Sequence, residues 1–374
     1  MGNGKKKTIV ISAINFDSGG PLSVLKDCLA FLGNEFQNSY DIIALVHRKN
    51  LFNVEGIRYI EFPNAKKHWG VRLYYEYVYF KKLSAQMKPY LWLSMHDITP
   101  NVDAEIRAVY CHNPSPFHKL TFKEAWFEPT FAVFNKLYLF FYKLNIRKNN
   151  CVIVQQAWLR EQFKTFFPEC NIVVAHPEIN LPDYPPHTDR KEGTSKTLFF
   201  FPSLPRVFKN FEVICEAVKR LCKLDVSNFE VLMTIDGSEN RYSKYIVGKY
   251  QHLEPLKFIG MQSRRKIYEY YALIDCMIFP SKLETWGLPI TEIQRFRKPI
   301  LVAKSQYSLE TLDGYSLANL FDPDDSLGLS VLMHRTIKGK VEYQQIKKNE
   351  ITYPSAKNWH ELFEILLRNE LDEV

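Results

Sequence analysis

Short runs of continuous apolar residues alternate with helical patterns along this chain, and this alternation constrains the fold most strongly. Seven runs lie in the first half and six in the second. They lack the polar–apolar alternation of a strand with one solvated face, so they indicate parallel sheets covered by helices on both faces. The predicted strands are 7–14, 40–47, 58–62, 90–96, 108–113, 151–155, 172–176, 197–203, 229–236, 256–261, 275–281, 299–304 and 319–322.

A segment rich in proline and charge, 177–196, interrupts the alternation and is typical of a linker. We therefore predict an α/β protein of two Rossmann-like, doubly wound domains that face a central cleft. The predicted domains are 1–180 and 181–354, followed by a C-terminal helical segment, 355–374, that packs back on the first domain. Helices are expected at 21–34, 209–223, 240–252, 263–273, 289–297, 326–337 and 355–371.

Composition narrows the class of protein. The 374 residues contain 46% hydrophobic and 24% charged residues, which are ordinary globular values and exclude a disordered or fibrous chain. No apolar run approaches the length of a membrane-spanning helix, and the N-terminus does not resemble a secretory signal. The seven cysteines are scattered, so we interpret them as reduced thiols of a cytoplasmic protein.

The charge is unevenly distributed. The net charge is +8, and residues 1–180 carry 22 Lys and Arg against 15 Asp and Glu. A basic, aromatic-rich half favours an anionic partner such as a membrane, a nucleic acid or a phosphorylated substrate, although a solvated basic face explains the charge equally well. The chain has no nucleic-acid motif, so we do not expect a nucleic-acid partner.

Because ligands of open parallel sheets bind at the carboxyl ends of strands, the turns after the strands are the candidate sites. In the first half, Gly19 and Gly20 precede a predicted helix that begins at Pro21, an arrangement that lets backbone approach an anion. It is not the G-x-G-x-x-G pattern of dinucleotide-binding proteins. His112, in a proline-stiffened loop, is a candidate contact for a substrate hydroxyl, and His96 is a weaker one.

The second half contains two further candidate turns. Arg206 and Lys209 follow the strand 197–203 at the start of a helix, where paired cations fit a diphosphate. The stretch 279–292 carries Glu284 in a loop, turns at Gly287-Leu288-Pro289, and places Glu292 in the first turn of a predicted helix. The alternative is that Glu292 complements the helix dipole and that Glu284 is a surface residue.

Together these motifs resemble the retaining, nucleotide-sugar-dependent glycosyltransferases with the GT-B fold, which include bacterial enzymes of lipid, capsule and O-antigen assembly. Glu284 and Glu292 have the E-x7-E spacing of that family, within F-P-S-x-x-E-x-x-G-L-P-x-x-E. The resemblance spans about 197–325. The other matching features are Arg206 and Lys209, Asp236-Gly237, 258–261, 270–281, Leu309-Glu310 and 321–324.

The resemblance implies a role for each matching residue. Arg206 and Lys209 are expected to bind the donor diphosphate, Glu292 the ribose hydroxyls, and Glu284 the hydroxyls of the donor sugar. Gly287 and Leu288 are expected to cap a phosphate. The remaining expected contacts are His112 with the sugar, Gly260 and Met261 with the base, and Gly19 and Gly20 with the phosphate or acceptor. Thr285-Trp286 replaces the usual Gly-Phe, which leaves the fine donor preference open.

The expected reaction is transfer of a hexose from a UDP- or GDP-sugar to an acceptor hydroxyl, with retention of anomeric configuration. The acceptor is expected to be a saccharide or a lipid-linked saccharide in polysaccharide, capsule or lipopolysaccharide biosynthesis. No cofactor and no metal are expected, because Asp322-Pro323-Asp324 is interpreted as structural. The alternatives are a catalytically silent nucleotide-sugar-binding scaffold and a GT-B-fold epimerase or phosphorylase.

Residues 117–150 mix aromatic side chains with lysines and arginines, and Asn135 and Lys136 interrupt the apolar run. The segment therefore predicts an interfacial contact with an anionic membrane rather than a span. The alternative is that these aromatics belong to the core of the first domain. We accordingly expect a cytoplasmic protein, with peripheral attachment to the inner face of the cytoplasmic membrane.

Overall fold

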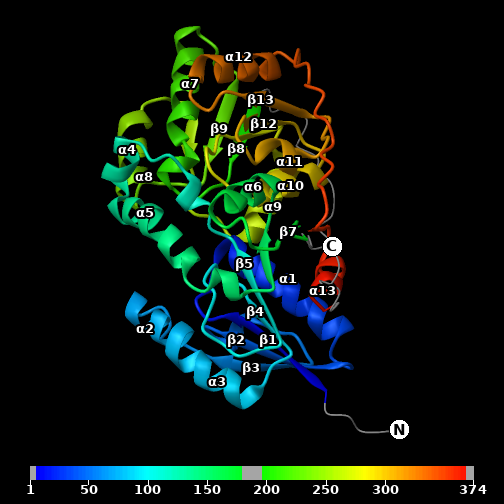
Figure 1. Cartoon of the computed structure of the whole chain (residues 1–374). Helices are drawn as coiled ribbons and strands as arrows, with labels where there is room; N and C mark the ends of the chain where they lie inside the picture. The colour runs from blue at the N-terminus through cyan, green and yellow to red at the C-terminus, as the bar shows by residue number, and fades with distance from the viewer. Residues whose placement is uncertain (1–5, 179–195, 368–374) are drawn as a thin grey trace. The chain divides into compact units, whose positions relative to one another are not determined.

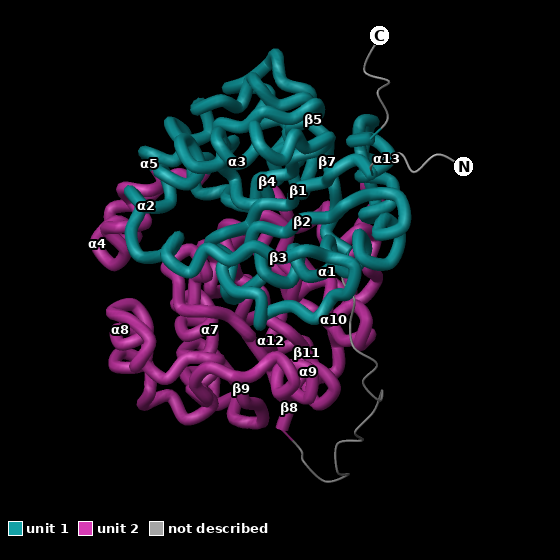
Figure 2. Tube along the Cα trace, turned by 90° about the horizontal axis from the view of Figure 1, so that it is seen from below, with its two compact units in different colours: residues 1–117, 136–180, 351–374 teal, residues 118–135, 181–350 magenta. Residues whose placement is uncertain are grey.

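The computed structural model describes residues 6–178 and 196–367, so most of the predicted linker lies outside the described residues. The chain divides into two compact units, coloured separately in Figure 2. Unit 1 comprises residues 1–117, 136–180 and 351–374, and unit 2 comprises 118–135 and 181–350. The predicted domains were contiguous, whereas here 118–135 groups with the second unit.

Unit 1 contains an eight-stranded sheet in which every described pairing is parallel. Its strand order is β14-β7-β6-β5-β4-β1-β2-β3, so the direction of winding reverses between β1 and β4. The strands are β1 (Lys7–Ala13), β2 (Tyr40–Val46), β3 (Ile57–Glu61), β4 (Leu91–Ser94), β5 (Ile106–Cys111), β6 (Cys151–Val154), β7 (Ile172–Ala175) and β14 (Ser355–Ala356).

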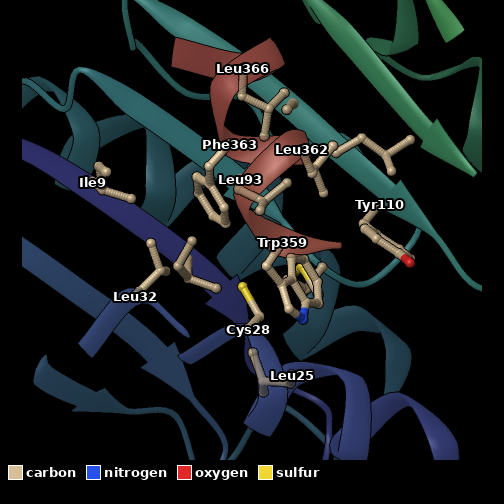
Figure 3. Close-up of a cluster of buried hydrophobic side chains, with 14 of the residues drawn as sticks. Ile9, Leu25, Cys28, Leu32, Leu93, Tyr110, Trp359, Leu362, Phe363 and Leu366 are labelled. Carbon is tan, nitrogen blue, oxygen red and sulfur yellow. The ribbon is translucent and has the colours of Figure 1, made fainter. Parts of the chain in front are cut away.

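The two faces of this sheet bury alternate residues of the same strands. On one face, Ile9 and Ile11 of β1 pack with α1 (Gly19–Glu35) and α13 (Trp359–Leu367). Figure 3 shows Trp359, Leu362, Phe363 and Leu366 of α13 in this core. On the other face, Val10 packs with Phe80 of α3 (Phe80–Met87). Helices thus cover both faces, as continuous apolar strands require.

A long helical segment precedes β4 and was not predicted. It consists of α2 (Trp69–Tyr74), a π-helical turn η2 (Tyr75–Tyr79) and α3, seen along the lower edge of unit 1 in Figure 1. Trp69 stacks on Phe141 with ring centroids 5.1 Å apart, so this segment packs against α5 (Pro129–Lys143). The other helices of unit 1 are η1 (Lys49–Leu51), η3 (Ser115–Phe117), η4 (Ile146–Lys148) and α6 (Ala157–Phe166).

Unit 2 contains a six-stranded sheet, also parallel in every described pairing, with the order β10-β9-β8-β11-β12-β13. Its strands are β8 (Thr197–Phe201), β9 (Phe229–Met233), β10 (Leu256–Phe258), β11 (Cys276–Phe279), β12 (Ile300–Ala303) and β13 (Ala318–Phe321). Its helices are α4 (Phe122–Phe127), η5 (Val207–Lys209), α7 (Phe211–Lys223), α8 (Arg241–Tyr250), α9 (Arg264–Leu273), α10 (Leu288–Arg295), α11 (Ser308–Leu312) and α12 (Ser326–Ile337).

The prediction of an α/β fold with two sheets of parallel strands is confirmed, and all thirteen predicted strands are present. One detail is wrong: α10 begins at Leu288, so Glu292 is its fifth residue and lies beyond the first turn. Pro289 stands at the second position, where its missing N–H costs nothing, and this moves the helix start back by one residue. Within the described residues, no helix is long and apolar enough to cross a membrane.

Candidate functional site

In unit 2 the strand order reverses between β8 and β11, the position where open α/β sheets bind ligands. The loops that follow these two strands lie side by side: the backbone N–H of Lys282 donates to the carbonyl of Phe208 at 2.8 Å. One loop carries Arg206 and Lys209 and the other carries Glu284. A cavity of about 540 Å³ opens beside them, lined in part by Val207, Asn210 and Lys282.

The two predicted cations of this site have carboxylate partners. The Lys209 ammonium forms an ion pair with Glu284, and both side chains are largely buried, 17% and 14% exposed. The Arg206 Nε donates to Glu128 at 2.5 Å, and the other Glu128 oxygen accepts from the Val207 backbone N–H at 2.7 Å. Each ion pair is electrically neutral, so an anionic ligand must either displace the carboxylate from its cation or bind the cation together with it.

Glu292 occupies a different environment from Glu284. Its carboxylate accepts from the hydroxyls of Tyr268 and Tyr271 on α9, at 3.2 and 3.1 Å, and lies 3.6 Å from Arg264. Burial raises its pKa, while Arg264 and the two tyrosines oppose that shift. The two glutamates of the E-x7-E motif thus bind different partners, and α10 holds Glu292 against α9.

The predicted glycines of unit 2 have conformations that favour glycine. Gly287 caps α10 with φ of +85°, and Leu288 begins that helix. Gly260 has φ of +67°, and a Cβ there would lie 2.9 Å from the Asp236 carboxylate. Met261 is 67% exposed beside it. Asp322 accepts from the backbone N–H of Asp324 at 2.8 Å, which fits its interpretation as part of a turn.

In unit 1 the strand order reverses between β1 and β4. Gly19, with φ of +74°, and Gly20 open α1 after β1. His112 follows β5, and its ring stacks on Tyr110 with centroids 4.5 Å apart. Burial lowers the pKa of His112 to about 4, although Asp97 and the Met95 backbone act in the other direction. The imidazole is therefore neutral at pH 7 and suited to hydrogen bonding with a hydroxyl.

Asp97 organises the loop that carries His112. Its carboxylate accepts from the backbone N–H groups of His112 and Asn113, at 2.5 and 2.9 Å. It also accepts from the hydroxyls of Tyr138 and Tyr142, at 3.0 and 3.2 Å. No motif in the sequence singles out Asp97, although its position directly after His96 at the end of a predicted strand is a usable signal.

His96 lies deep inside unit 1 rather than at a surface. It is fully buried, with Nε2 2.8 Å from a Glu76 carboxyl oxygen and Nδ1 3.1 Å from the Asn15 side-chain oxygen. Burial and the nearby Arg72 hold its pKa well below the usual range. These neighbours come from α2, η2 and the end of β1, so no local pattern in the sequence joins them.

The structure therefore brings Arg206, Lys209 and Glu284 together at one edge of the unit 2 sheet, whereas Glu292 contacts α9. The roles expected for these four residues in binding a nucleotide-sugar donor stay predictions. Glu128, the partner of Arg206, was not predicted because it is 78 residues away in the sequence. Among residues 6–178 and 196–367, no group of three or more His, Cys, Asp or Glu side chains is arranged to hold a metal ion.

Solved structures share this fold. Sucrose-phosphate synthase from Thermosynechococcus elongatus superposes with a TM-score of 0.64 at 14% identity, covering 90% of each chain. The lipopolysaccharide outer core galactosyltransferase WaaB gives 0.61 at 12% identity, covering 90% of this chain and 92% of that one. Anabaena HepE, solved with UDP and glucose, gives 0.60 at 12%, covering 89% and 90%. No curated protein sequence matches the chain.

A family model described as glycosyl transferases group 1 matches residues 187–352, which include all six strands of the second sheet and both loops at its reversal point. The sequence resemblance pointed to the same residues. The sheet orders and the solved structures agree that the chain has the GT-B fold, and its residues 187–352 match the model of the group 1 glycosyltransferases.

Proposed function

We propose that the chain transfers a hexose from a UDP- or GDP-sugar to a hydroxyl of a saccharide or lipid-linked saccharide, with retention and without a metal. The observation that carries this proposal is the meeting of the Arg206–Lys209 loop and the Glu284 loop at the reversal point of the unit 2 sheet. That region belongs to the segment matched by the glycosyltransferase family model. Anabaena HepE, a protein of the same fold, was solved with UDP-glucose.

The chemistry requires stabilisation of a nucleotide diphosphate leaving group. Breaking the anomeric carbon–oxygen bond develops positive charge on the sugar and negative charge on the departing phosphate. Lys209 and Arg206 supply fixed cations for that negative charge. When the donor diphosphate forms an ion pair with Lys209, the Glu284 carboxylate is released from its own ion pair with Lys209 and can accept hydrogen bonds from the donor-sugar hydroxyls. The neutral imidazole of His112 supplies a hydrogen bond without adding charge.

The first experiment measures the thermal unfolding of the full chain with UDP, GDP, ADP and CMP, each with and without EDTA. A ligand at a hundredfold excess over its Kd stabilises the native state by about 2.7 kcal/mol. We expect one nucleotide to stabilise the protein equally in both conditions. Lys209→Met is expected to weaken that response, whereas Lys223→Met, at an exposed lysine that ends α7 and does not line the cavity, is the matched control. If no nucleotide stabilises the wild type, the proposal fails.

The second experiment tests the reaction with the sugar conjugates of the nucleotide found. Transfer is followed by release of the nucleotide, and the anomeric configuration of the product is read from its proton coupling constants. Loss of a leaving-group cation is expected to lower kcat of Lys209→Met by about 10²–10³. Nucleotide binding without any turnover favours the scaffold alternative. Acceptor-independent isomerisation favours an epimerase, and a phosphate requirement favours a phosphorylase.

A peripheral membrane attachment is supported by exposed apolar side chains in unit 1. Leu137 and Phe140 of α5 are 50% and 58% exposed, and Tyr74 and Val78 of the adjoining helical segment are 51% and 45% exposed. Because Trp69 of that segment stacks on Phe141 of α5, the two elements are neighbours. Exposed apolar side chains on neighbouring helices of a basic protein fit the interfacial region of an anionic bilayer.

The attachment is tested by co-sedimentation with vesicles of phosphatidylglycerol and phosphatidylcholine, compared with pure phosphatidylcholine. We expect binding to the anionic vesicles that decreases with salt. Phe140→Glu is expected to reduce it, while Leu224→Glu, which changes an exposed apolar residue at the end of α7 and outside 117–150, is the matched control. Equal sedimentation of wild type and Phe140→Glu rules out this surface as the attachment site.

A further inference from the structure

A small cavity lies in unit 1, apart from every residue assigned above to the donor. It has a volume of about 180 Å³ and is lined by Asn15, Ala65, Lys66, His68, Trp69 and Arg72. Asn15 follows β1, at the point where the unit 1 sheet reverses its strand order beside β4. Open α/β sheets bind ligands at this position, and the volume equals that of several water molecules.

Arg72 is the unusual residue of this cavity. It is 8% exposed, and its Nη2 donates to the carbonyl of His96 at 2.9 Å. Its Nε is buried and has no hydrogen-bond partner in the described part of the chain. Among the same residues, no carboxylate lies within 4.0 Å of its guanidinium. A buried charge without a counter-ion is costly, so an anionic ligand would relieve it.

The acidic residue nearest in sequence on the same helical segment does not neutralise Arg72. Glu76 lies in the π-helical turn η2, is fully buried, and contacts His96 rather than the guanidinium. Burial raises the pKa of Glu76 to about 8, although the positive charge of Arg72 opposes this shift, so the carboxyl group is mainly protonated at neutral pH. The Glu76–His96–Asn15 chain is then uncharged, and Arg72 keeps its positive charge. Single π-helical turns are frequent at functional sites.

The other walls of the cavity suit a sugar derivative more than a free inorganic ion. Trp69 supplies an aromatic ring, which stacks on Phe141 and has the Arg72 guanidinium 4.9 Å from its centroid, and Asn15 supplies a side-chain amide. Lys66 stands at the rim and is already ion-paired with Asp17. An aromatic ring, an amide and a guanidinium without a carboxylate partner form the kind of lining that orients a polar ligand bearing one acidic group.

We propose that this cavity binds a carboxylate or phosphate group carried by the saccharide acceptor, with the Arg72 guanidinium as its counter-ion and Asn15 and Trp69 beside the sugar. The assignment to the acceptor rests on the proposed function, whereas the binding of an acidic sugar does not. The acceptor is accordingly an acidic or phosphorylated saccharide rather than a neutral one.

The test titrates the full chain with glucuronate, glucose 6-phosphate, glucose and inorganic phosphate, and measures Kd by calorimetry. We expect one acidic sugar to bind at least about tenfold more tightly than glucose and than inorganic phosphate, because a charge-assisted hydrogen bond is lost with glucose and the sugar contacts are lost with phosphate. Comparison of glucuronate with glucose 6-phosphate distinguishes a carboxylate from a phosphate. Equal binding of glucose and both acidic sugars overturns the proposal.

Two variants address the residues. Arg72→Met removes the charge at similar length, and Asn15→Asp adds a carboxylate while keeping an acceptor for His96. Each is expected to weaken binding of the acidic sugar at least about tenfold, whereas Lys67→Met, at an exposed lysine outside the lining, leaves it unchanged. The Asn15 variant keeps the test decisive if Arg72→Met fails to fold. Unchanged binding in Asn15→Asp overturns the proposal.

The nucleotide response in the same samples separates the two proposals. Arg72→Met and Asn15→Asp are expected to show the same nucleotide-induced thermal shift as the wild type. Lys209→Met is expected to bind the acidic sugar with unchanged Kd. Absence of any nucleotide response, with acidic-sugar binding intact, refutes the proposed function but not the site. Intact nucleotide binding with no preference for acidic sugars refutes the site alone.

Discussion

Replacement of Asp97 tests whether this carboxylate holds the His112 loop in place. Four groups donate to it: two backbone N–H groups of the loop and the hydroxyls of Tyr138 and Tyr142. Asp97→Ala leaves all four without this acceptor. A hydrogen bond to a charged group contributes about 1.5–3 kcal/mol, and water replaces part of it because the side chain is half-buried. We expect a loss of about 3–5 kcal/mol in the stability of unit 1.

Asp97→Asn is the matched variant. Its remaining side-chain oxygen still accepts from the two backbone N–H groups, and asparagine tolerates the φ of +71° at this position. The Tyr138 hydroxyl, which contacts the other oxygen, can accept from the new amide, and the Tyr142 hydroxyl can still donate to the retained oxygen. We therefore expect a loss of only about 1–2 kcal/mol. Asp97→Gly, which also lacks the acceptor but tolerates the positive φ, separates the lost hydrogen bonds from the backbone strain of Asp97→Ala.

Because the chain has two units, global unfolding is not a sufficient measurement. Hydrogen exchange followed by mass spectrometry gives the stability of peptides from β4 and β5 separately from those of unit 2. Transfer activity is measured in parallel, and the nucleotide-induced thermal shift is expected to stay unchanged in both variants. If Asp97→Ala and Asp97→Asn destabilise β5 equally, the four hydrogen bonds do not carry the stability assigned to them.

Three further predictions concern pH, the core and backbone conformation. Because the pKa of Glu76 is raised, the native state binds more protons than the unfolded state, and the stability of unit 1 is expected to fall by about 2 kcal/mol between pH 6.5 and 8. The lowered pKa values of His96 and His112 affect stability only below pH 6.5. Glu76→Gln should therefore make the stability measured by urea unfolding independent of pH across that window. Phe363 is fully buried and stacks on Phe31, so Phe363→Ala is expected to lower the free energy of unfolding by about 3–5 kcal/mol and to increase hydrogen exchange in α1. Unchanged protection of α1 would contradict the packing in Figure 3. Gly260→Ala is expected to lower the stability of unit 2 by about 1–2 kcal/mol, because the backbone has a positive φ there and the added Cβ would contact the Asp236 carboxylate. Gly248→Ala, in an open position on α8, should be neutral or stabilising, and equal effects of the two substitutions would argue against the strain.

The strands and most helices were predictable because their signals are local. A continuous run such as Cys276–Phe279 must be buried on both faces, whatever packs on it. The helical segment 69–87 escaped prediction because it buries the polar Arg72 and Glu76 and exposes tyrosines such as Tyr74. A π-helical turn at Tyr75–Tyr79 also breaks the helical period. Residues 118–135 group with unit 2 because Glu128 and Phe131 contact Arg206 and Phe208, contacts that no local pattern contains.

The candidate donor residues came from motifs confined to two short stretches, each a strand end followed by a helix start. Sequence alone therefore determined the parallel α/β class, the two sheets and the loops that carry Arg206, Lys209 and Glu284. Only the tertiary structure decided that Lys209 pairs with Glu284, that Glu292 contacts α9, and that Arg72, Glu76, His96 and Asn15 meet in one place. The physical reason is that hydrogen bonds and ion pairs depend on distances between side chains far apart in the chain, and the sheet order alone brings those side chains together.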